Sequence, residues 1–571
     1  MNPPTADVVT EDPTSRAGTR RAPSGRRRRP AVPTLILAVC LVAYGAWLVH
    51  SASGMWFWID DYEFLIHRGT IPGLDHGLFE PHNGHWSTMV VLVYRVLFAA
   101  FGMTTYVPYV LVTIVIHLAI AALLYTLLCR EGANRWAALL ASWFVVFIPI
   151  GFDNILWDAA MNNTGALLFG FLAVLALSRA GFSNRSVAMA WALLVVALMF
   201  SGTGVSAVVL AAAFAGVSRG PLVGLKVASV PAAVFVVWFL AEGRHANSLE
   251  WSLTQVPQFV WTGLTGTLGK VIGVETAGPV LFVCLLAALL TDRHGPEDVR
   301  HLAWAGLLAA TTQLFLEALT RGFLGADLAN SGRYAYFTVV LLTPAFGLLI
   351  NRIWHVAVEP RWVVAVIAVV LAAGHLTHSL GALSTFAEGW RGVTSETRGF
   401  VLATSENVAD GQLVVAPELT GPYEFIDVEA LGREDVRRRL PDIEVSAEDR
   451  LRSETELNIG VSPDTYELFR PVLLDLTSGW KEREAALGPG CQAYTATRDD
   501  PLIQIATQDG TEIGITSEAT QVVTVLQRDD VQGPVRIWGV RPGAIHIAVT
   551  ARDAVLKISF NAGGEYTICK Q

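Results

Sequence analysis

The stretch AVPTLILAVCLVAYGAWLVHSASGMWFWIDDY (residues 31–62) joins an apolar run of about twenty residues to three aromatic residues and an acidic pair. A helix of about twenty residues rises about 30 Å, which is the thickness of the hydrocarbon core of a bilayer. We therefore predict that the run beginning at Ala31 crosses a membrane. Asp60 and Asp61 then follow directly beyond its boundary, behind aromatic residues that suit the interface.

Similar apolar runs recur to about residue 381 and then stop. The 571-residue chain is 52% hydrophobic and only 16% charged, whereas soluble domains carry about 25% charged residues. This composition excludes an ordinary soluble enzyme. It predicts a polytopic α-helical membrane protein with a multi-pass domain over residues 31–384. About eleven spans are expected, near residues 31–52, 106–128, 136–150, 165–178, 187–201, 204–218, 226–241, 273–291, 302–319, 334–350 and 361–381.

The basic residues predict the orientation of the chain. Residues 1–30 are rich in Arg, Pro, Ser and Thr and are expected to form a disordered cytoplasmic arm. A twelfth apolar segment, Trp86–Gly102, would put Arg95 near the bilayer centre at a cost of about 2.5–3.5 kcal/mol, so we predict that it lies on the membrane. Eleven spans then leave ten basic residues in cytoplasmic loops, as the positive-inside rule requires. They are Arg130, Arg135, Arg179, Arg185, Arg219, Lys226, Arg293, Arg300, Arg352 and Arg361.

The same topology places the C-terminal domain, residues 385–571, outside the cell membrane. Residues 391–571 carry a net charge of −11 and the rest of the chain +2, so no basic face predicts a nucleic-acid partner. Residues 385–485 mix helical and extended patterns. Residues 486–571 alternate in short strands, which predicts a sandwich-like or jelly-roll-like fold. Its two cysteines, Cys491 and Cys569, predict a disulfide in this oxidising compartment.

The first outer loop, WFWIDDYEFLIHRGTIPGLDHGLFEPHNGHWS (residues 56–87), concentrates acid–base side chains. Two adjacent carboxylates at the hydrocarbon boundary repel each other and are partly desolvated, so at least one pKa should rise. The pair is a candidate general base, although a pair exposed to headgroups has the same pattern. Glu63, His82 and His85 are further candidates, and the spacing of the two histidines predicts a shared helix face. The loop has enough ligands for a divalent ion but no HExxH or paired CxxC pattern, so a metal requirement stays open.

This layout resembles the GT-C superfamily of glycosyltransferases. Members include the protein O-mannosyltransferases, the lipid A aminoarabinose transferase, the oligosaccharyltransferase catalytic subunit and the actinobacterial arabinosyltransferases. The resemblance covers residues 31–381 in architecture but only the DDY stretch, Asp60 to Tyr62, in motif. It implies a hexosyl- or pentosyltransferase that moves a sugar from a polyprenyl-phosphate donor to an acceptor hydroxyl. The acceptor would be a cell-envelope glycan, lipid or protein on the outer face.

The resemblance also implies roles for acidic residues. Asp60 or Asp61 would deprotonate the acceptor or stabilise an oxocarbenium-like sugar. Some relatives carry a second acidic motif in the next outer loop. Here that loop reads GFDNILWDAAMNN (residues 151–163) and offers Asp153 and Asp158. They are not arranged as DxD or DxE, although they remain the candidates for a metal ligand in this loop.

Such a reaction requires cations on the outer face to hold the phosphate of the lipid carrier. Few basic residues are predicted there, so each runs against the positive-inside trend. Arg333, in NSGRYAYF (residues 330–337), lies beside Tyr334 where the tenth span begins. Its guanidinium suits bidentate phosphate binding, although an arginine at this depth also suits simple snorkelling. Arg321 is a second candidate.

Two other functions stay open at this point. One is a transporter or flippase for lipid-linked sugars, although polar residues gather in outer loops rather than at mid-membrane. The other is a non-catalytic scaffold that displays the C-terminal domain. No phosphate-binding loop, dinucleotide fingerprint or nucleophile elbow is present. The sequence does not decide the sugar, the carrier length or the oligomeric state.

Overall fold

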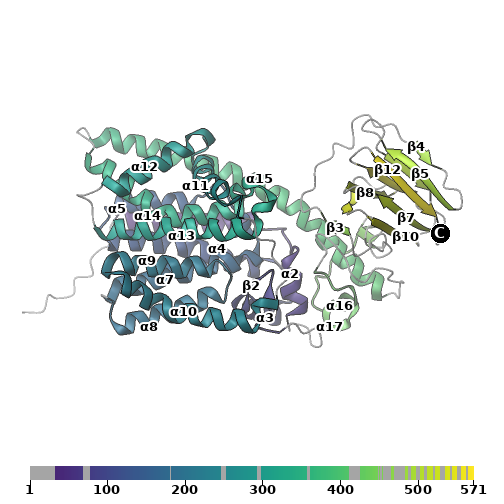
Figure 1. Cartoon of the computed structure of the whole chain (residues 1–571), viewed down its shortest axis with the longest axis horizontal. Helices are drawn as coiled ribbons and strands as arrows, with labels where there is room; N and C mark the ends of the chain where they lie inside the picture. Colours follow the sequence, from purple (N-terminus) through teal and green to yellow (C-terminus); the bar gives the residue numbers. More distant parts are fainter. Residues whose placement is uncertain are drawn as a thin grey trace, which may run out of the picture.

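The computed structural model describes residues 32–68, 77–180, 182–245, 253–291, 297–356, 361–409, 425–447, 449–450 and 453, together with the backbone of short strands between 465 and 570. Within these residues the molecule is a helical bundle, joined by one long helix to a smaller C-terminal part (Figure 1). Seven helices are long and apolar enough to cross a membrane, by length and composition. They belong to α1 (Val32–Ser51), α4 (Val107–Arg130), α7 (Met161–Ala180), α10 (Pro221–Ala241), α13 (Glu297–Arg321), α14 (Gly332–Val356) and α15 (Arg361–Ala409).

Five shorter apolar helices complete the bundle. Four of them coincide with the remaining predicted spans, namely α5 (Arg135–Val146), α8 (Asn184–Leu198), α9 (Gly204–Arg219) and α12 (Gly278–Thr291). The fifth, α3 (Thr88–Phe101), has 14 residues and covers the segment predicted to lie on the membrane. At 1.5 Å per residue α3 is about 21 Å long, and α5 and α12, with 12 and 14 residues, are no longer. Length therefore does not separate α3 from the predicted spans. The seven long apolar helices support the multi-pass membrane architecture, while the count of eleven spans stays a prediction.

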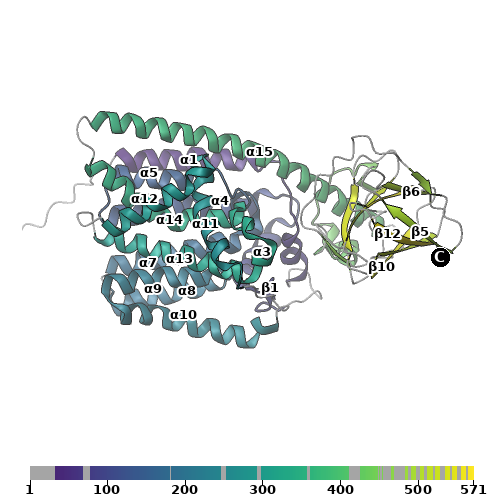
Figure 2. The same ribbon diagram turned by 45° about the horizontal axis from the view of Figure 1, so that its top comes forward.

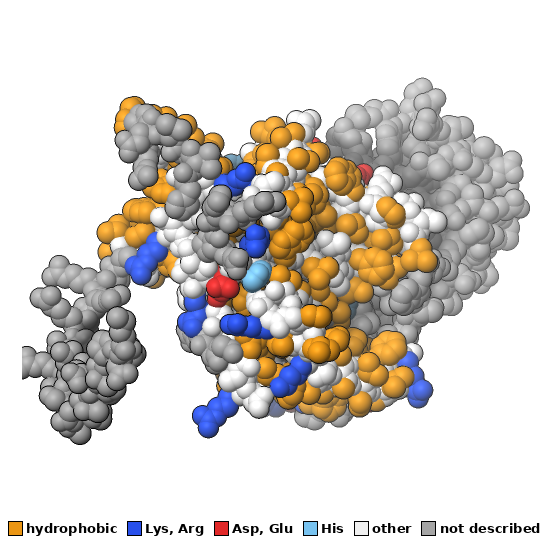
Figure 3. Space-filling view, turned by 60° about the vertical axis from the view of Figure 1, so that its left-hand side comes forward, with side chains coloured by type: hydrophobic (Ala, Val, Ile, Leu, Met, Phe, Trp, Pro, Cys, Tyr) orange, Lys and Arg blue, Asp and Glu red, His pale blue; other side chains and the backbone are white. Residues whose placement is uncertain are grey.

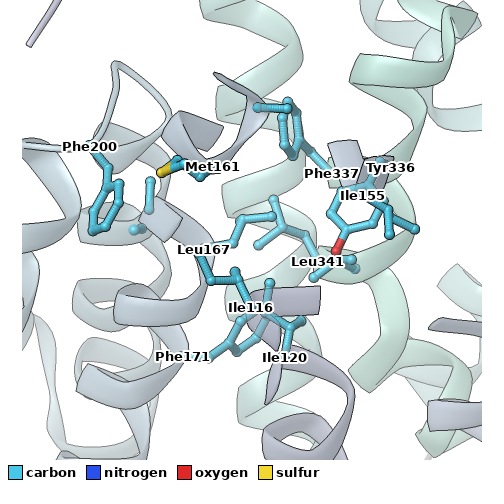
Figure 4. Close-up of a cluster of buried hydrophobic side chains, with 14 of the residues drawn as sticks. Ile116, Ile120, Ile155, Met161, Leu167, Phe171, Phe200, Tyr336, Phe337 and Leu341 are labelled. Atoms are coloured by element: carbon cyan, nitrogen blue, oxygen red, sulfur yellow. The ribbon is translucent and has the colours of Figure 1, made fainter. Parts of the chain in front are cut away.

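The core of the bundle lies where α4, α7 and α14 meet. Ile116 and Ile120 of α4 pack there with Leu167 and Phe171 of α7 and with Leu341 of α14 (Figure 4). Close helix approach is built into the sequence. A Cβ added to Gly306 of α13 would lie 2.1 Å from the carbonyl oxygen of Leu341, so only glycine fits at that crossing.

Described basic side chains meet at one end of the bundle. Arg130 donates to Ser178 over 2.8 Å, and Lys226 donates to Asn184 over 3.0 Å. Arg352 reaches Thr291 of α12 at the same end. Figure 3 shows Lys and Arg side chains there, bordered by hydrophobic surface. This is the end that the positive-inside rule assigns to the cytoplasm.

The long helix α15 reaches from the basic end to the C-terminal part (Figure 2). Its 49 residues span about 73 Å, more than twice the hydrocarbon thickness. Val369, in its first half, is 68% exposed, as expected of a side chain that faces lipid. The helix continues beyond residue 384, so the first part of the predicted C-terminal domain is a rigid extension of the last span.

Short elements gather at the end of the bundle opposite the basic residues. They are α2 (Asp60–Tyr62), a π-helical turn η1 (Glu63–His67), β1 (Pro81–His82), β2 (His85–Trp86), α6 (Asp153–Leu156), η2 (Asp158–Ala160), η3 (Gly243–His245), η4 (Glu275–Ala277), η5 (Gly322–Leu324) and η6 (Ala326–Asn330). The 17-residue helix α11 (Val256–Ile272) lies beside η6, where Lys270 donates to the carbonyl of Asn330. The α6 segment is tied to α4 because Thr113 and Tyr106 donate to the carbonyls of Ile155 and Leu156. These ties fix the segment between Asp153 and Asp158 against the start of α4.

The segment after α15 contains α16 (Val428–Gly432) and α17 (Glu434–Arg437). Ser405 of α15 donates to the carbonyl of Leu431 over 2.8 Å. After α17, Arg439 donates to the carbonyl of Phe98 in the last turn of α3 over 2.9 Å. The segment therefore joins the C-terminal half of α15 to the C-terminal end of α3.

The C-terminal strands form two sheets, with orders β10-β7-β12-β5 and β3-β9-β8-β11-β6-β4. All neighbours pair antiparallel except β4 and β6. Two sheets are what a sandwich requires, and the sandwich itself stays a prediction. The strands are β3 (Thr465–Glu467), β4 (Arg483–Ala485), β5 (Gly490–Ala496), β6 (Leu502–Ala506), β7 (Thr511–Ser517), β8 (Gln521–Gln527), β9 (Pro534–Val540), β10 (Gly543–Val549), β11 (Val555–Phe560) and β12 (Gly564–Lys570).

The register of β5 and β12 bears on the predicted disulfide, because Cys491 lies directly opposite Cys569. Cross-strand partners have Cα atoms about 4.5–5.5 Å apart, within the range that a disulfide requires. We expect non-reducing peptide mapping of the alkylated protein to recover these two cysteines as one cross-linked pair. Cys40, Cys129 and Cys284, which are free in the structure, serve as internal controls. Alkylation of both Cys491 and Cys569 would contradict the prediction.

Candidate active site

The acidic pair follows a backbone turn in an unusual conformation. Ile59 has φ 40° and ψ −103°, a region that a β-branched residue rarely occupies. Such a conformation costs about 1–3 kcal/mol and persists only where the surroundings impose it. The π-helical turn that begins at Glu63 is a second irregularity of a kind that often marks functional sites. These two backbone irregularities flank Asp60 and Asp61, whose side chains lie in different surroundings.

Asp61 is fully buried and held by four donors. Its Oδ2 accepts from the backbone N–H of Trp58 over 2.7 Å and from the indole of Trp157 over 3.1 Å. Its Oδ1 accepts from the Tyr94 hydroxyl over 2.6 Å and from the backbone N–H of Ala159 over 3.2 Å. These contacts tie α2, α3 and the second outer loop together. The hydrogen bonds of Asp61 therefore hold these elements together, and both of its oxygens are already occupied.

Asp61 is also coupled to a second acid through Tyr94. The Tyr94 hydroxyl lies 2.6 Å from Asp61 and 2.7 Å from Oδ2 of Asp158. A hydroxyl has one hydrogen to donate, so Tyr94 hydrogen-bonds both carboxyls at once only when one of them is protonated. Burial, followed by the negative charge of Asp158, raises the pKa of Asp61 well above its ordinary value. The two carboxyls therefore titrate as a coupled pair.

Asp60 is the more accessible carboxylate, with its side chain 15% exposed. Its Oδ1 lies 3.5 Å from His82 Nε2 and 3.5 Å from the Asn83 amide nitrogen. Burial alone would raise the pKa of Asp60, but the hydrogen bond to His82 and the charges of His82, Arg333 and Arg321 outweigh it and lower that pKa. Asp60 is therefore ionised at neutral pH and stands in the field of two arginines.

The histidines lie side by side for a different reason from the one predicted. The shared helix face is wrong, because β1 and β2 form a hairpin in which His82 pairs with His85. The turn residues Asn83 and Gly84 have φ 49° and 77°, as a tight hairpin turn of the Asn-Gly type requires. This dipeptide was the sequence signal for the hairpin.

His85 is held neutral beside the arginines. Burial, then the charges of Arg321 and His82, lower the pKa of His85 to about 3. The ring packs against Gly202, where an added Cβ would lie 2.8 Å from Nδ1. The glycine therefore leaves the space that His85 occupies.

Arg333 and Arg321 belong to adjoining helix ends. Arg333, at the start of α14, lies 4.8 Å above the Trp157 ring, and its Nε is 3.9 Å from Oδ2 of Asp153. Gly151 allows this packing, because a Cβ there would lie 2.6 Å from the carbonyl oxygen of Gly332. Arg321, in the last turn of α13, donates to the Tyr334 hydroxyl. The predicted cations and Asp60 thus form one electrostatic cluster.

The other predicted residues are engaged elsewhere. Glu63 forms a buried ion pair with Arg68 at 2.6 Å. Arg68 also donates to the carbonyls of Glu80 and Pro81, so the pair braces the outer loop. Asp153 lies 3.9 Å from Arg333 without a hydrogen bond between them, whereas Asp158 is hydrogen-bonded to Tyr94. Among the described residues, no group of three or more His, Cys, Asp or Glu side chains is arranged to hold a metal ion.

Comparisons with known proteins give matches in structure only. No family model and no curated protein matches the chain. The fold is similar to ArnT from Cupriavidus metallidurans, solved both alone and bound to undecaprenyl phosphate. Both matches have 13% identity and cover 90% of this chain and 98% of ArnT, with TM-scores of 0.43 and 0.40.

Two longer proteins also match. An Archaeoglobus fulgidus oligosaccharyltransferase has 14% identity and a TM-score of 0.39 over 72% of this chain and 62% of its own. The mycobacterial arabinofuranosyltransferase AftD has 12% identity and a TM-score of 0.44 over 94% of this chain and 61% of its own. The chain thus spans less than two thirds of either protein. These structures are GT-C glycosyltransferases, so the predicted resemblance is confirmed as a resemblance. With TM-scores below 0.5, it assigns no reaction to this chain.

Proposed function

We propose that this protein transfers a sugar from a polyprenyl-phosphate carrier to an acceptor hydroxyl of a cell-envelope glycan, lipid or protein at the outer face of the membrane. The observation that carries the proposal is the placement of ionised Asp60 in the field of Arg321 and Arg333. Asp60 and the two arginines lie at the end of the bundle opposite Arg130, Lys226 and Arg352. A carboxylate close to two cations that can hold a phosphate suits the cleavage of a sugar–phosphate bond.

In the proposed reaction the acceptor oxygen attacks the anomeric carbon of the donor sugar. The acceptor C1–O bond forms while the bond from C1 to the phosphate oxygen breaks. The acceptor proton passes to Asp60, and the bonding electrons leave with the phosphate. Arg321 and Arg333 hold the carrier phosphate and stabilise the charge that develops on it. Asp60 also lies where its charge stabilises a positively charged sugar.

Donor binding prepares Asp60 for this role. The two arginine charges contribute to the lowered pKa of Asp60 in the free protein. A bound phosphate offsets those charges, so the pKa of Asp60 rises when the donor is in place. A carboxylate with a higher pKa is a stronger general base. The site is therefore expected to gain basicity only when the carrier is bound.

The experiment uses the full chain in proteoliposomes with a panel of polyprenyl-phosphate sugars and membrane-derived acceptors, and it measures the release of polyprenyl phosphate. Arg321→Ala is expected to raise the KM for the donor about 10- to 100-fold, because it removes a charge-assisted contact to the phosphate. Arg321→Lys keeps the charge but loses the planar fork, so an intermediate value is expected.

Arg438→Ala is the matched control, since that side chain, directly after α17, is 72% exposed. It should leave the KM unchanged. Transbilayer movement of an intact lipid-linked sugar, with no phosphate release for any donor, would contradict the proposal and favour transport instead.

A further inference from the structure

A cavity of about 750 Å³ adjoins the acidic pair. Trp58, two residues before Asp60, lines it together with Trp157, which donates to Asp61. Its opposite wall comes from the outer half of α15, over residues 382–390. The cavity is of the size that small-ligand sites have.

An aromatic surface lines much of this cavity. The ring centroids of Trp58 and Trp390 are 4.7 Å apart, and those of Trp58 and Trp157 are 5.6 Å apart. Phe386 stacks on Trp390 at 5.4 Å. The C–H faces of a sugar ring pack well against the apolar faces of aromatic rings.

Unpaired polar atoms stand among these rings. The indole nitrogens of Trp58 and Trp390 and Oδ1 of Asn330 are buried and have no hydrogen-bond partner among the described residues. A buried donor or acceptor without a partner costs about 1–3 kcal/mol. Hydroxyl groups both donate and accept, so a ligand rich in them would satisfy both kinds of atom.

Charged groups complete the wall. Lys270 donates to the carbonyl of Asn330 over 2.9 Å. Arg333 approaches Asp153 only to 3.9 Å, beyond hydrogen-bond distance, so both keep donor or acceptor capacity. An aromatic wall with one carboxylate and two cations suits a polyhydroxylated ring better than a hydrocarbon chain.

We propose that this cavity binds a saccharide ring of the acceptor. The assignment of this saccharide to the acceptor rests on the proposed function, whereas saccharide binding itself does not. Arg321 and Tyr334 are absent from the described wall of the cavity, so a donor phosphate held by Arg321 lies outside it. The wall on α15 begins at residue 382, beyond the predicted span, on the side from which an envelope acceptor arrives. Arg333 lines the cavity and also acts on Asp60, so it connects the two subsites.

The test uses the full chain in lipid nanodiscs and saturation-transfer NMR with a panel of water-soluble methyl glycosides, both pentofuranosides and hexopyranosides. At least one glycoside should bind the unmodified protein. Trp390→Ala should weaken its affinity about tenfold, the factor that corresponds to about 1.4 kcal/mol of lost ring contact. Trp390→Phe keeps an aromatic face and should lose less.

Trp362→Ala is the matched control, because Trp362 lies on the same helix and is 67% exposed. It should leave glycoside binding unchanged. Phe386→Leu provides a second cavity variant if Trp390→Ala does not yield folded protein, and weaker binding is again expected. The proposal is overturned if no glycoside binds, or if the cavity variants bind as well as the Trp362→Ala control.

Two further arms separate this proposal from the proposed function. Asp60→Asn should keep glycoside binding, so saccharide recognition is measured without turnover. Addition of polyprenyl phosphate without a sugar should not displace the glycoside. Displacement would assign the cavity to the donor and overturn the acceptor assignment. Loss of glycoside binding in Trp390→Ala alongside normal turnover by Asp60→Asn would instead end the proposed function and leave the saccharide site standing.

Discussion

Asp60→Asn is expected to slow sugar transfer about 10³-fold while the protein remains folded. The substitution removes the negative charge and the proton acceptor but keeps the size of the side chain. Among the described residues, the Asp60 side chain makes polar contacts with His82 and Asn83, both at 3.5 Å, so few stabilising interactions depend on its ionised form. The rate of polyprenyl phosphate release under single-turnover conditions measures the chemical step, and gel filtration with thermal unfolding measures the fold.

The control for this change is Asp327→Asn on the exposed surface of η6. It makes the same chemical substitution away from Asp60 and should leave the rate within about twofold of the unmodified protein. An Asp60→Asn protein with an unchanged rate would remove Asp60 from the reaction. An equal loss in both variants would point to a general effect of charge instead.

Asp61→Ala is expected to damage the fold itself. The change leaves the donors from Trp58, Trp157 and Ala159 without their shared acceptor. The Tyr94 hydroxyl keeps Asp158 as an acceptor. Each unsatisfied buried donor costs about 1–3 kcal/mol, so the total loss is at least about 3 kcal/mol. We expect low yields of monodisperse protein and an apparent Tm lowered by at least about 5 °C. A normal Tm would contradict the structural role.

The raised pKa of Asp61 adds a pH dependence to this second prediction. The pKa of Asp61 is raised in the folded protein above its ordinary value of 3.8, so the folded state holds the proton more tightly than the unfolded state. This contribution to stability is fully present below pH 3.8 and is lost as the pH rises through the folded-state pKa. Asp61→Asn cannot titrate, so its apparent Tm should fall less with rising pH. Parallel Tm profiles for the two proteins would contradict a raised pKa of Asp61.

The helices could be predicted from the sequence because each reads from a local run of apolar residues. The eleven predicted spans all fall on helices, and the segment around Arg95 falls on the short helix α3. The length of α15 was not predicted, because polar residues after residue 381 end the apolar run without ending the helix. A helix needs no apolar run once it leaves the bilayer and packs on other elements.

The site could be predicted as a set of residues but not as an arrangement. Local spacing suggested a helix face for His82 and His85, and the turn preference of Asn83-Gly84 overruled it. The difference between Asp60 and Asp61 depends on partners far along the chain. Tyr94 and Trp157 are separated from Asp61 by 33 and 96 residues. No local pattern shows which of two adjacent acids will face them.

The central claim is that Asp60 serves the chemistry while Asp61 serves the architecture. The most direct measurement is an experimental structure of the full chain with a non-hydrolysable phosphonate analogue of a polyprenyl-phosphate sugar. We predict that the phosphonate contacts Arg321 or Arg333, that the anomeric carbon faces Asp60, and that Asp61 keeps its four donors. A phosphonate bound away from both arginines, or an anomeric carbon that faces Asp61 instead, would contradict the account.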